Sequence, residues 1–424
     1  MERFLDSHVN SLQIIDAGGQ NSCLPYEIRR VDSLLAIQHA VKESKSLNKK
    51  IVLFGMRHSQ AGQICHEGAL ALDINSYNKI IHFDQDRSQI TVESGAQWKE
   101  IQSAIKPYGL ALQVMQFVNT FTVGGSMSAN IFSRDPRRSR LIESIVSFSL
   151  VNPSGKILTC SRKENYELFT LVIEGHGLFG VIAEVTIQLI PDTVLYAYTS
   201  VFTPEEYINS ILHEVQNSSH LTYHNAQYDL DRGCFMQQII SNSYYSHALP
   251  LGPPENIFTR NDMMNNTREM ELTFWDPEAS DALLGFFIPA AYFLKFQSLL
   301  QNIIGQTQLH VFKCSMNYLP DHQESFLFSL QGPCLKFAIF YRHEKNRRKE
   351  ADWLKKACAD ATLECCGTLY LTFDFLASKH QMEAFYPKMS EFLTKKLYYD
   401  PEELFYNRFY ERMRNLCLDL QYQL

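Results

Sequence analysis

Glycine is unevenly distributed along the chain, and this distribution constrains the fold more than any other sequence feature. Of the 19 glycines in 424 residues, 11 lie between Gly55 and Gly180. Glycine lacks a side chain, so it allows tight turns and the close approach of the backbone to another group. The region from Gly55 to Gly180 is therefore predicted to bring its backbone close to a ligand or to another part of the chain.

The glycine-rich half has the hydrophobic periodicity of mixed helices and strands. Apolar residues at helical spacing predict helices, and alternating or continuous apolar runs predict strands. We expect helices over residues 34–46 and 98–105, and strands over 50–54, 89–94, 144–151, 157–160 and 181–190. Asn152-Pro-Ser-Gly155 is typical of a turn and predicts a hairpin. The first half is therefore predicted to be α+β.

The composition changes after Pro191, where glycines become rare and aromatic and amide residues dominate. We expect helices over residues 279–303, 349–359 and 381–396, strands over 309–318, 337–341 and 367–375, a long loop over 242–267 and an amphipathic tail from residue 400. The second half is thus also predicted to be α+β, with a domain boundary near Pro191.

Charge and hydropathy exclude several classes of protein. Lys plus Arg is 39 and Asp plus Glu is 46, a net charge of −7, which gives no general attraction to nucleic acid or anionic membranes. The longest apolar run, Leu283–Leu294, is too short to span a bilayer and contains Pro289. The ten cysteines lack metal-ligand spacing, so no metal site is expected. We predict a cytoplasmic protein with reduced thiols, no nucleic-acid partner and no membrane span.

Three glycine clusters are candidates for anion binding. The first, residues 54–62, follows an apolar strand, the second covers residues 120–126, and the third is Gly175-His-Gly-Leu-Phe-Gly180. Backbone N–H groups in such segments can converge on a pyrophosphate. The third cluster formally matches GxGxxG, but a strand follows it where the nicotinamide-binding motif requires a helix, so a Rossmann site is disfavoured. Each cluster alone is typical of a tight turn; three together favour a common ligand.

These clusters resemble motifs of the vanillyl-alcohol-oxidase type of FAD-binding oxidoreductases, whose flavin domain is of the PCMH type. The sequence has Gly55-Met-Arg-His-Ser59, Thr122-Val-Gly-Gly125 and Gly175 to Ile182 in the family order. The likeness is strong over residues 15–195, and it is closest to the branch of decaprenylphosphoryl-ribose oxidase and the sugar-alcohol or lactone oxidases. It implies an α+β fold with a PCMH-type FAD domain at residues 1–194, a cap domain for the substrate at 195–390, and a tail at 391–424 that returns to the FAD domain.

The resemblance also implies which residues bind FAD. They are Phe54, Gly55, Met56, Arg57, His58, Ser59, Gln60, Thr122, Gly124, Gly125, Ser128, Gly177, Gly180, Val181, Ile182 and Asn407. His58 lies where many members attach the flavin covalently, whereas other members bind FAD without a link; we favour attachment over a histidine that contacts a phosphate. Cys65 and Cys160 are interpreted as buried thiols.

The residues of the reaction are harder to assign. The closest branch has a histidine where this chain has Phe132 and a lysine where our alignment sets Phe373. The polar candidates that remain for catalysis are Tyr370, Asp374, Tyr341 and Arg342. Arg134, Arg137, Arg138 and Arg140 are interpreted singly as a solvated loop, although together they could contact an anionic substrate.

The function implied by the resemblance is the oxidation of an alcohol-type small molecule, such as a polyol, sugar or lactone, by hydride transfer to flavin N5. Dioxygen, a quinone or another protein could then accept the electrons. A different class stays open: a flavin-binding protein with little turnover, whose cap domain is an interaction surface. Phe132 and Phe373 give weight to that alternative.

Overall fold

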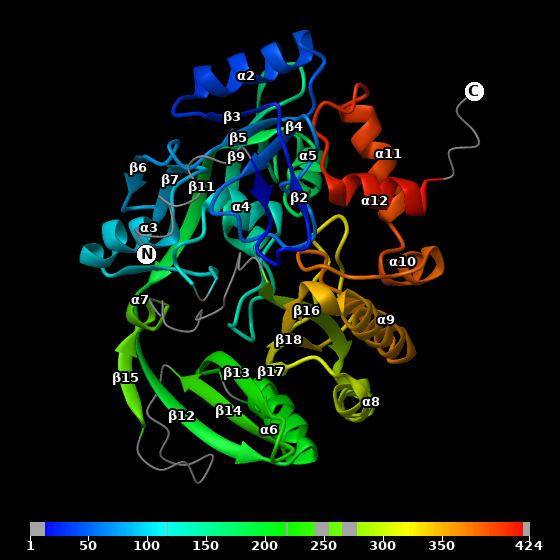
Figure 1. The fold of residues 1–424 in the computed structure, drawn as a ribbon. Helices are drawn as coiled ribbons and strands as arrows, with labels where there is room; N and C mark the ends of the chain where they lie inside the picture. The colour runs from blue at the N-terminus through cyan, green and yellow to red at the C-terminus, as the bar shows by residue number, and fades with distance from the viewer. Residues whose placement is uncertain (1–12, 117, 218, 242–253, 265–277, 419–424) are drawn as a thin grey trace.

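The computed structural model describes residues 13–116, 118–217, 219–241, 254–264 and 278–418, and this part of the chain forms four β-sheets (Figure 1). Two small sheets come first. β1 (Ile14–Ile15) pairs with β2 (Ser22–Cys23), and β3 (Glu27–Arg30), β5 (Leu70–Asp73) and β4 (Ile51–Phe54) form a parallel sheet in that order. Between β3 and β4 runs α2 (Leu34–Ser46), which Ser33 caps and which buries Ile37, Ala40, Val41 and Ser44 at helical spacing.

A six-stranded antiparallel sheet follows and completes the glycine-rich half. Its order is β10 (Ile157–Ser161), β9 (Ile145–Val151), β11 (Val181–Pro191), β7 (Gln89–Glu93) and β6 (Ile80–Asp84), with β8 (Leu110–Leu112) paired to the end of β11. The helices of this half are α3 (Trp98–Ile105), α4 (Val123–Ser128) and α5 (Tyr166–Val172), with 3-10 turns at Lys106–Tyr108 and Leu141–Ser144. The chain then passes from β11 to the last sheet between Pro191 and Val194.

The last sheet has eight antiparallel strands. Their order is β15 (Asn256–Thr259), β12 (Val194–Phe202), β14 (Cys234–Ser241), β13 (Leu221–Asp229), β17 (Val311–Leu319), β18 (Cys334–Glu344), β16 (Ala279–Pro289) and β19 (Thr368–Leu369). The helices α6 (Pro204–Asn217), α8 (Phe293–Gln306) and α9 (Arg348–Glu364) lie along one side of it in Figure 1, and α7 (Arg260–Met263) follows β15. The 3-10 turns are Ala290–Tyr292 and Lys345–Arg347.

The two faces of the eight-stranded sheet have different neighbours. On β18, Phe337 points toward the helices, and its ring lies 4.9 Å from that of Phe296 on α8. The next residue back, Lys336, points to the opposite face, where its Nζ lies 4.0 Å from the ring centroid of Phe132. Because Phe132 follows α4, this face meets the glycine-rich half of the molecule.

Three helices end the described chain: α10 (Lys379–Phe385), α11 (Met389–Tyr399) and α12 (Arg408–Cys417). Between α11 and α12 the chain returns to β4, where Ile51 N–H donates to Leu404 O at 2.7 Å and Tyr406 N–H donates to Ile51 O at 3.1 Å. The carboxylate of Asp400, paired with buried Lys396, accepts the N–H groups of Leu404 and Phe405 and holds this turn. None of the described helices combines the length and apolar character needed to cross a membrane.

The predicted elements of the first half are confirmed, with α2 and α3 at the expected bounds. Three predictions in the second half are wrong. Residues 279–303 are a strand followed by a helix: Ala279–Pro289 is a buried strand between β18 and β19, and the helix begins only after Pro289. A continuous apolar run suits either element, so periodicity alone does not separate them.

The other two corrections concern shorter segments. The strand expected over 367–375 is only β19, because the chain turns at Tyr370, where Phe373 N–H donates to Tyr370 O at 3.3 Å. The helix expected over 381–396 is two helices, separated by Pro387, which lacks the N–H that a continuous helix needs. The loop expected over 242–267 contains β15 and α7, and its residues 242–253 and 265–267 lie outside the described residues.

Candidate functional site

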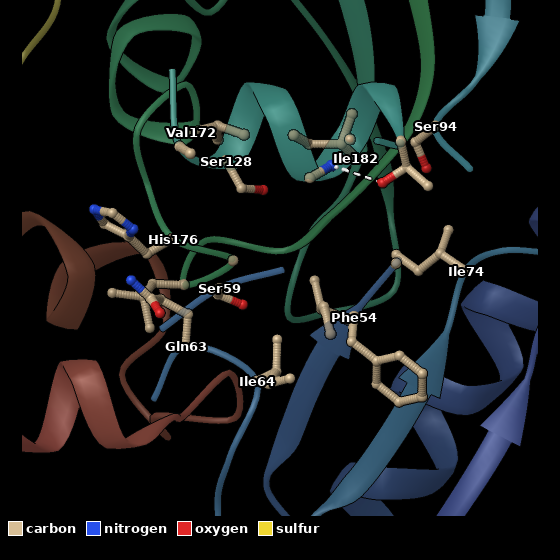
Figure 2. A pocket seen from close by; sticks show the side chains of 18 of the residues that line it. Phe54, Ser59, Gln63, Ile64, Ile74, Ser94, Ser128, Val172, His176 and Ile182 are labelled. Carbon is tan, nitrogen blue, oxygen red and sulfur yellow. Dashed lines mark hydrogen bonds between the residues drawn. The ribbon is translucent and has the colours of Figure 1, made fainter. Parts of the chain in front are cut away.

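A cavity lies where the three glycine clusters meet. Its volume is about 110 Å³ for the centres of water-sized spheres, and about 800 Å³ when all the empty space out to its open mouth is counted. Its walls are Leu53, Phe54, Gly55, Ser59, Gln63, Ile64, Ile74, Ser94, Thr122, Gly124, Gly125, Ser128, Ala129, Val172, His176, Gly177, Leu178, Phe179, Gly180, Ile182 and Thr372. Figure 2 shows Ser59, Gln63, Ser128 and His176 gathered on one side of this space, and Ile74 and Ser94 on another.

The first two glycine clusters pack directly against each other. A Cβ on Gly55 would lie 2.4 Å from Thr122 Oγ1, and one on Gly124 would lie 2.9 Å from Ser94 Cβ. Thr122 caps α4, and its Oγ1 accepts the Gly125 N–H at 3.3 Å. Glycine at these positions therefore lets the end of β4 and the start of α4 approach closely enough to form one wall of the cavity.

The third cluster forms the facing wall with an unusual backbone. Gly180 has φ +141°, and a Cβ there would lie 2.4 Å from Val151 O. His176 is held at φ +50°, a left-handed conformation that costs a non-glycine residue about 1 kcal/mol or more. Its N–H donates to Ser128 O at 3.0 Å, and its carbonyl accepts from Asn407 Nδ2 at 3.0 Å. Segments from α4, the third cluster and α12 therefore fix His176 at the cavity.

Polar atoms on the cavity walls are left for a ligand, among them Thr372 Oγ1. Among the described residues, neither His176 Nε2 nor Ser94 Oγ has a hydrogen-bond partner, although both are buried. Burial lowers the pKa of His176 to about 3, so the imidazole is neutral at neutral pH. A buried polar group without a partner costs about 1–3 kcal/mol, which a hydrogen-bonding ligand in the cavity would relieve. These walls fit a dinucleotide such as FAD, which offers both donors and acceptors.

The predicted cofactor residues fall into two groups. The cavity walls include Phe54, Gly55, Ser59, Thr122, Gly124, Gly125, Ser128, Gly177, Gly180 and Ile182. The walls do not include Met56, Arg57, His58, Gln60, Val181 and Asn407, which lie beside wall residues in sequence or in space. Gln60, for example, accepts the N–H of Leu283 at 3.0 Å and so joins the first cluster to β16.

His58 lies in the turn between two wall residues, Gly55 and Ser59. Its ring packs against Phe121 at 4.2 Å between centroids, and burial lowers its pKa to about 4. The imidazole is therefore neutral at physiological pH, which is the state that a nucleophilic nitrogen requires. Covalent attachment through His58 stays a prediction.

Two of the predicted catalytic residues belong to one polar network. Asp374 pairs with Lys355 Nζ at 2.6 Å and with Arg412 Nη1 at 2.9 Å. Lys355 also contacts Gln20, whose Nε2 donates to the hydroxyl of Tyr341 at 3.4 Å. Burial raises the pKa of Asp374, but the charges of Lys355 and Arg412 outweigh it and hold this pKa below its usual value. Asp374 is therefore ionised and strongly held.

The other two predicted catalytic residues lie apart. Tyr370 is buried with its ring 5.4 Å from Phe132 and 5.5 Å from Phe287, close to the wall residue Thr372. Arg342, on the same face of β18 as Lys336, donates from Nε to Asp281 Oδ1 at 2.7 Å. The structure thus joins Asp374 and Tyr341 in one network, and none of the four predicted catalytic residues belongs to the cavity walls.

Several wall residues were not predicted from the sequence. His176 lies inside the third cluster, where only the glycines drew attention, and Ser94 ends a predicted strand. Gln63 and Thr372 come from segments 309 positions apart, and Gln63 Nε2 donates to Thr372 O at 3.4 Å. For His176 and Ser94, the available signal was a polar residue within a glycine motif or at the end of a strand. No such signal was available for Gln63 and Thr372.

Comparison with known proteins agrees with this geometry at the level of a class. Residues 27–161 match the family model of the FAD binding domain. The chain therefore carries an FAD-binding domain of the oxidoreductase type, FAD is its cofactor, and the predicted resemblance is confirmed.

The chain is similar over part of its length to individual enzymes that are named as lactone oxidases and dehydrogenases. The chain is 24% identical over 201 residues to L-gulonolactone oxidase of Mus musculus, which is 47% of this chain and 46% of that enzyme. It is 29% identical over 177 residues to mitochondrial L-galactono-1,4-lactone dehydrogenase of Arabidopsis thaliana, and 25% over 195 residues to D-arabinono-1,4-lactone oxidase of Candida glabrata. These two matches cover 41% and 42% of this chain, and 28% and 36% of the relatives. The chain thus spans less than half the length of these relatives.

Proposed function

We propose that the protein is an FAD-dependent oxidoreductase that oxidises a CH–OH group of a sugar-lactone-type substrate. The observation that carries this proposal is the cavity between the three glycine clusters, whose walls include His176 and Ser94, with Nε2 and Oγ atoms that have no partners among the described residues. The names of the relatives, two lactone oxidases and a lactone dehydrogenase, support the substrate class.

In this proposal the glycine-rich half holds the cofactor and the eight-stranded sheet holds the substrate. Residues 1–194 with 391–424 form the FAD domain, and residues 195–390 form the cap. The wall residues bind and orient the dinucleotide, while Thr372 closes the cavity from the cap side. FAD, when bound, supplies the acceptor for a hydride from the substrate carbon.

Removal of a hydride from an alcohol also requires a group that accepts the hydroxyl proton. Asp374 suits this role poorly, because two cations hold it ionised and lower its basicity. Lys336 suits it better, because burial, together with the charge of Arg134, lowers its pKa well below the usual value and favours the neutral amine. We propose Lys336 or Tyr370 as the proton acceptor, with Asp374 positioning Tyr341 through Lys355 and Gln20.

The central test is anaerobic reduction of the purified yellow protein. We expect bleaching of the flavin by an aldonolactone from a panel that also contains polyols and sugar phosphates. Re-oxidation with air, a quinone or a protein acceptor then separates an oxidase from a dehydrogenase. A colourless protein that takes up no added FAD would disprove the proposal.

A specific observation favours one alternative, a flavin-binding protein with little turnover. The rings of Phe132, Phe287 and Tyr370 pack together beside Lys336, so the proposed proton acceptor is surrounded by apolar side chains. If no member of the panel reduces the bound flavin, this alternative is the better description.

The covalent link is tested separately. After acid precipitation we expect flavin colour and an FAD mass increment in the protein pellet, and their loss in His58→Ala, which should still bind FAD through the cavity walls. His66→Ala, a nearby histidine outside those walls, is the control. Free flavin in the supernatant of the unmodified sequence would rule out attachment and leave FAD binding intact.

A further inference from the structure

A glutamate with a strained backbone stands directly before the third glycine cluster. Glu174 lies in the sequence between the wall residues Val172 and His176, both labelled in Figure 2. Its φ is +74°, a left-handed conformation that glycine adopts freely and that costs a residue with a side chain about 1–2 kcal/mol. Its N–H donates to Met127 O at 3.0 Å, which binds this backbone to α4. A glutamate therefore occupies a position whose backbone suits glycine.

The carboxylate of Glu174 pairs with a buried arginine. Arg140 Nη2 donates to Glu174 Oε1 at 2.7 Å, and the two side chains are 0% and 4% exposed. Burial raises the pKa of Glu174, and the charge of Arg140 opposes that rise. The interpretation of Arg140 as part of a solvated loop is therefore wrong, whereas Arg137 and Arg138 are 43% and 49% exposed.

The guanidinium of Arg140 also contacts the second half of the chain. Its central carbon lies 4.3 Å from the ring centroid of Phe328, in the segment between β17 and β18, and 6.0 Å from those of Phe287 on β16 and of Tyr370. Among the described residues, neither Nε nor Nη1 of Arg140 has a hydrogen-bond partner. Apart from its bond to Glu174, the guanidinium is therefore held by aromatic rings, on which its planar group can stack.

The backbone around Arg140 is fixed to the glycine-rich half. Leu141 N–H donates to Ile131 O at 2.8 Å, and Ser133 N–H donates to Ser139 O at 2.8 Å, so residues 139–141 pair with the segment that follows α4. Arg140 thus joins this segment, the residue before the third glycine cluster and the rings of the second half.

We propose that Arg140 and Glu174 are positioning residues for the cofactor, which link the eight-stranded sheet to the third glycine cluster and so hold His176 and Gly177 in place against FAD. The stack on Phe328 fixes the guanidinium, the guanidinium fixes the carboxylate, and the carboxylate holds the left-handed backbone next to the cavity wall. This inference rests on FAD as the cofactor and not on the oxidation of a lactone.

The test compares folding stability with the surroundings of the bound flavin in the same variants. Urea unfolding measures the first, and the visible circular dichroism per bound flavin in the yellow protein measures the second. Arg140→Met should lower the unfolding midpoint, because it leaves a buried carboxylate unpaired, and reduce the flavin signal by about half or more. Arg140→Met combined with Glu174→Gly removes both charges and the strained side chain. We expect most of the midpoint to return in this double variant and the flavin signal to stay reduced.

A conservative variant keeps the test independent of how well Arg140→Met folds. Arg140→Lys retains a cation beside Glu174 but lacks the planar group that stacks on Phe328. It should unfold near the midpoint of the unmodified sequence and still show the reduced flavin signal. An unchanged signal in Arg140→Lys would contradict the proposal.

A second buried ion pair provides the matched control. Asp400→Asn breaks the pair of Lys396 and Asp400 in the tail, so it should lower the unfolding midpoint and leave the flavin signal unchanged. If the flavin signal falls as far in Asp400→Asn, or returns together with stability in the double variant, Arg140 and Glu174 have a structural role alone and the proposal is wrong. Lactones are absent from these measurements, so their failure to reduce the flavin would affect the proposed function alone.

Discussion

Two buried histidines show how the two halves of the molecule differ. His224 lies in the eight-stranded sheet, where Tyr318 N–H donates to its Nδ1 at 3.1 Å and the Tyr207 hydroxyl lies 3.4 Å from its Nε2. His176 lies at the cavity of the glycine-rich half, and its Nε2 has no partner among the described residues. Burial lowers the pKa of both to about 3. The sheet satisfies this polar group with its own chain, whereas the cavity leaves the equivalent group for a ligand.

The largest effect is expected from a side chain that fills the cavity of the glycine-rich half. Gly125→Leu should reduce FAD affinity by a hundredfold or more, because a Cβ there already lies 2.9 Å from Thr122 Oγ1 and the rest of the side chain would occupy ligand space. Gly305→Leu is the control, since a Cβ at that glycine on α8 meets no atom within 4 Å. Flavin content and fluorescence titration give the result; equal affinities would show that the dinucleotide does not lie against α4.

A second test separates binding from chemistry. Lys336→Met should leave FAD bound and slow anaerobic flavin reduction by about a hundredfold, the usual cost of losing a general base. Lys295→Met, at an exposed lysine paired with Glu364, is the matched control. Stopped-flow absorbance measures the rate. If Lys336→Met reduces flavin normally while Tyr370→Phe is slow, the proton acceptor is the tyrosine.

A third test concerns the charged network of Asp374, Lys355 and Arg412. Asp374→Asn should lower the free energy of unfolding by about 3 kcal/mol, because Lys355 and Arg412 lose their shared carboxylate. Flavin reduction should slow by less than tenfold, since Asp374 positions other groups in our proposal. Asp352→Asn, at the more exposed aspartate 3.7 Å from Lys355, is the control for urea unfolding and for the rate. If flavin reduction in Asp374→Asn is a hundredfold slower, Asp374 is the proton acceptor and our assignment is wrong.

The smallest expected effect sharpens the comparison of the two histidines. In the unfolded chain each histidine binds a proton below its usual pKa of 6.5, whereas in the folded chain it does so only near pH 3. Each histidine therefore makes the free energy of unfolding fall as the pH drops from 6.5 toward 3. Each accounts for about 1.4 kcal/mol per pH unit. His176→Gln and His224→Gln should both flatten the dependence of urea unfolding on pH. Bound FAD should alter the pH dependence of His176→Gln and leave that of His224→Gln unchanged. If FAD alters both, the two histidines do not differ in their contact with the ligand.

The sequence was sufficient for the glycine-rich half because its signals are local. Turn residues and the spacing of apolar residues predicted α2, α3 and the hairpin of β9 and β10, and the glycine motifs located much of the cavity walls. The second half was less predictable because tertiary contacts override its local pattern. Ala279–Pro289 is a strand only because β18 and β19 pair with its two edges, and the chain after Leu369 turns away from the sheet so that Tyr370 packs on Phe132.

The candidate site shows the same limit. Gln63 and Thr372 lie at one cavity although they are separated by most of the chain, and Lys336 gains its character from burial beneath Phe132. The residues next to these positions in the sequence predict neither the contact between Gln63 and Thr372 nor the burial of Lys336. The boundary between residues 194 and 195 and the assignment of catalytic residues therefore stay predictions that the experiments above address.

The pairing of the tail with β4 has a consequence for synthesis. Lys50 Nζ donates to Glu402 O, a contact across 352 positions, and Ile51 beside it bonds Leu404. Ribosomes add about 5–20 residues per second, so the edge of β4 waits on the order of 20–70 s for its partner to emerge. During that interval the edge of β4 lacks the bonds of Ile51 to Leu404 and Tyr406. A chaperone or the flavin itself would have its greatest influence on the yield of folded protein before the last turn of the chain arrives.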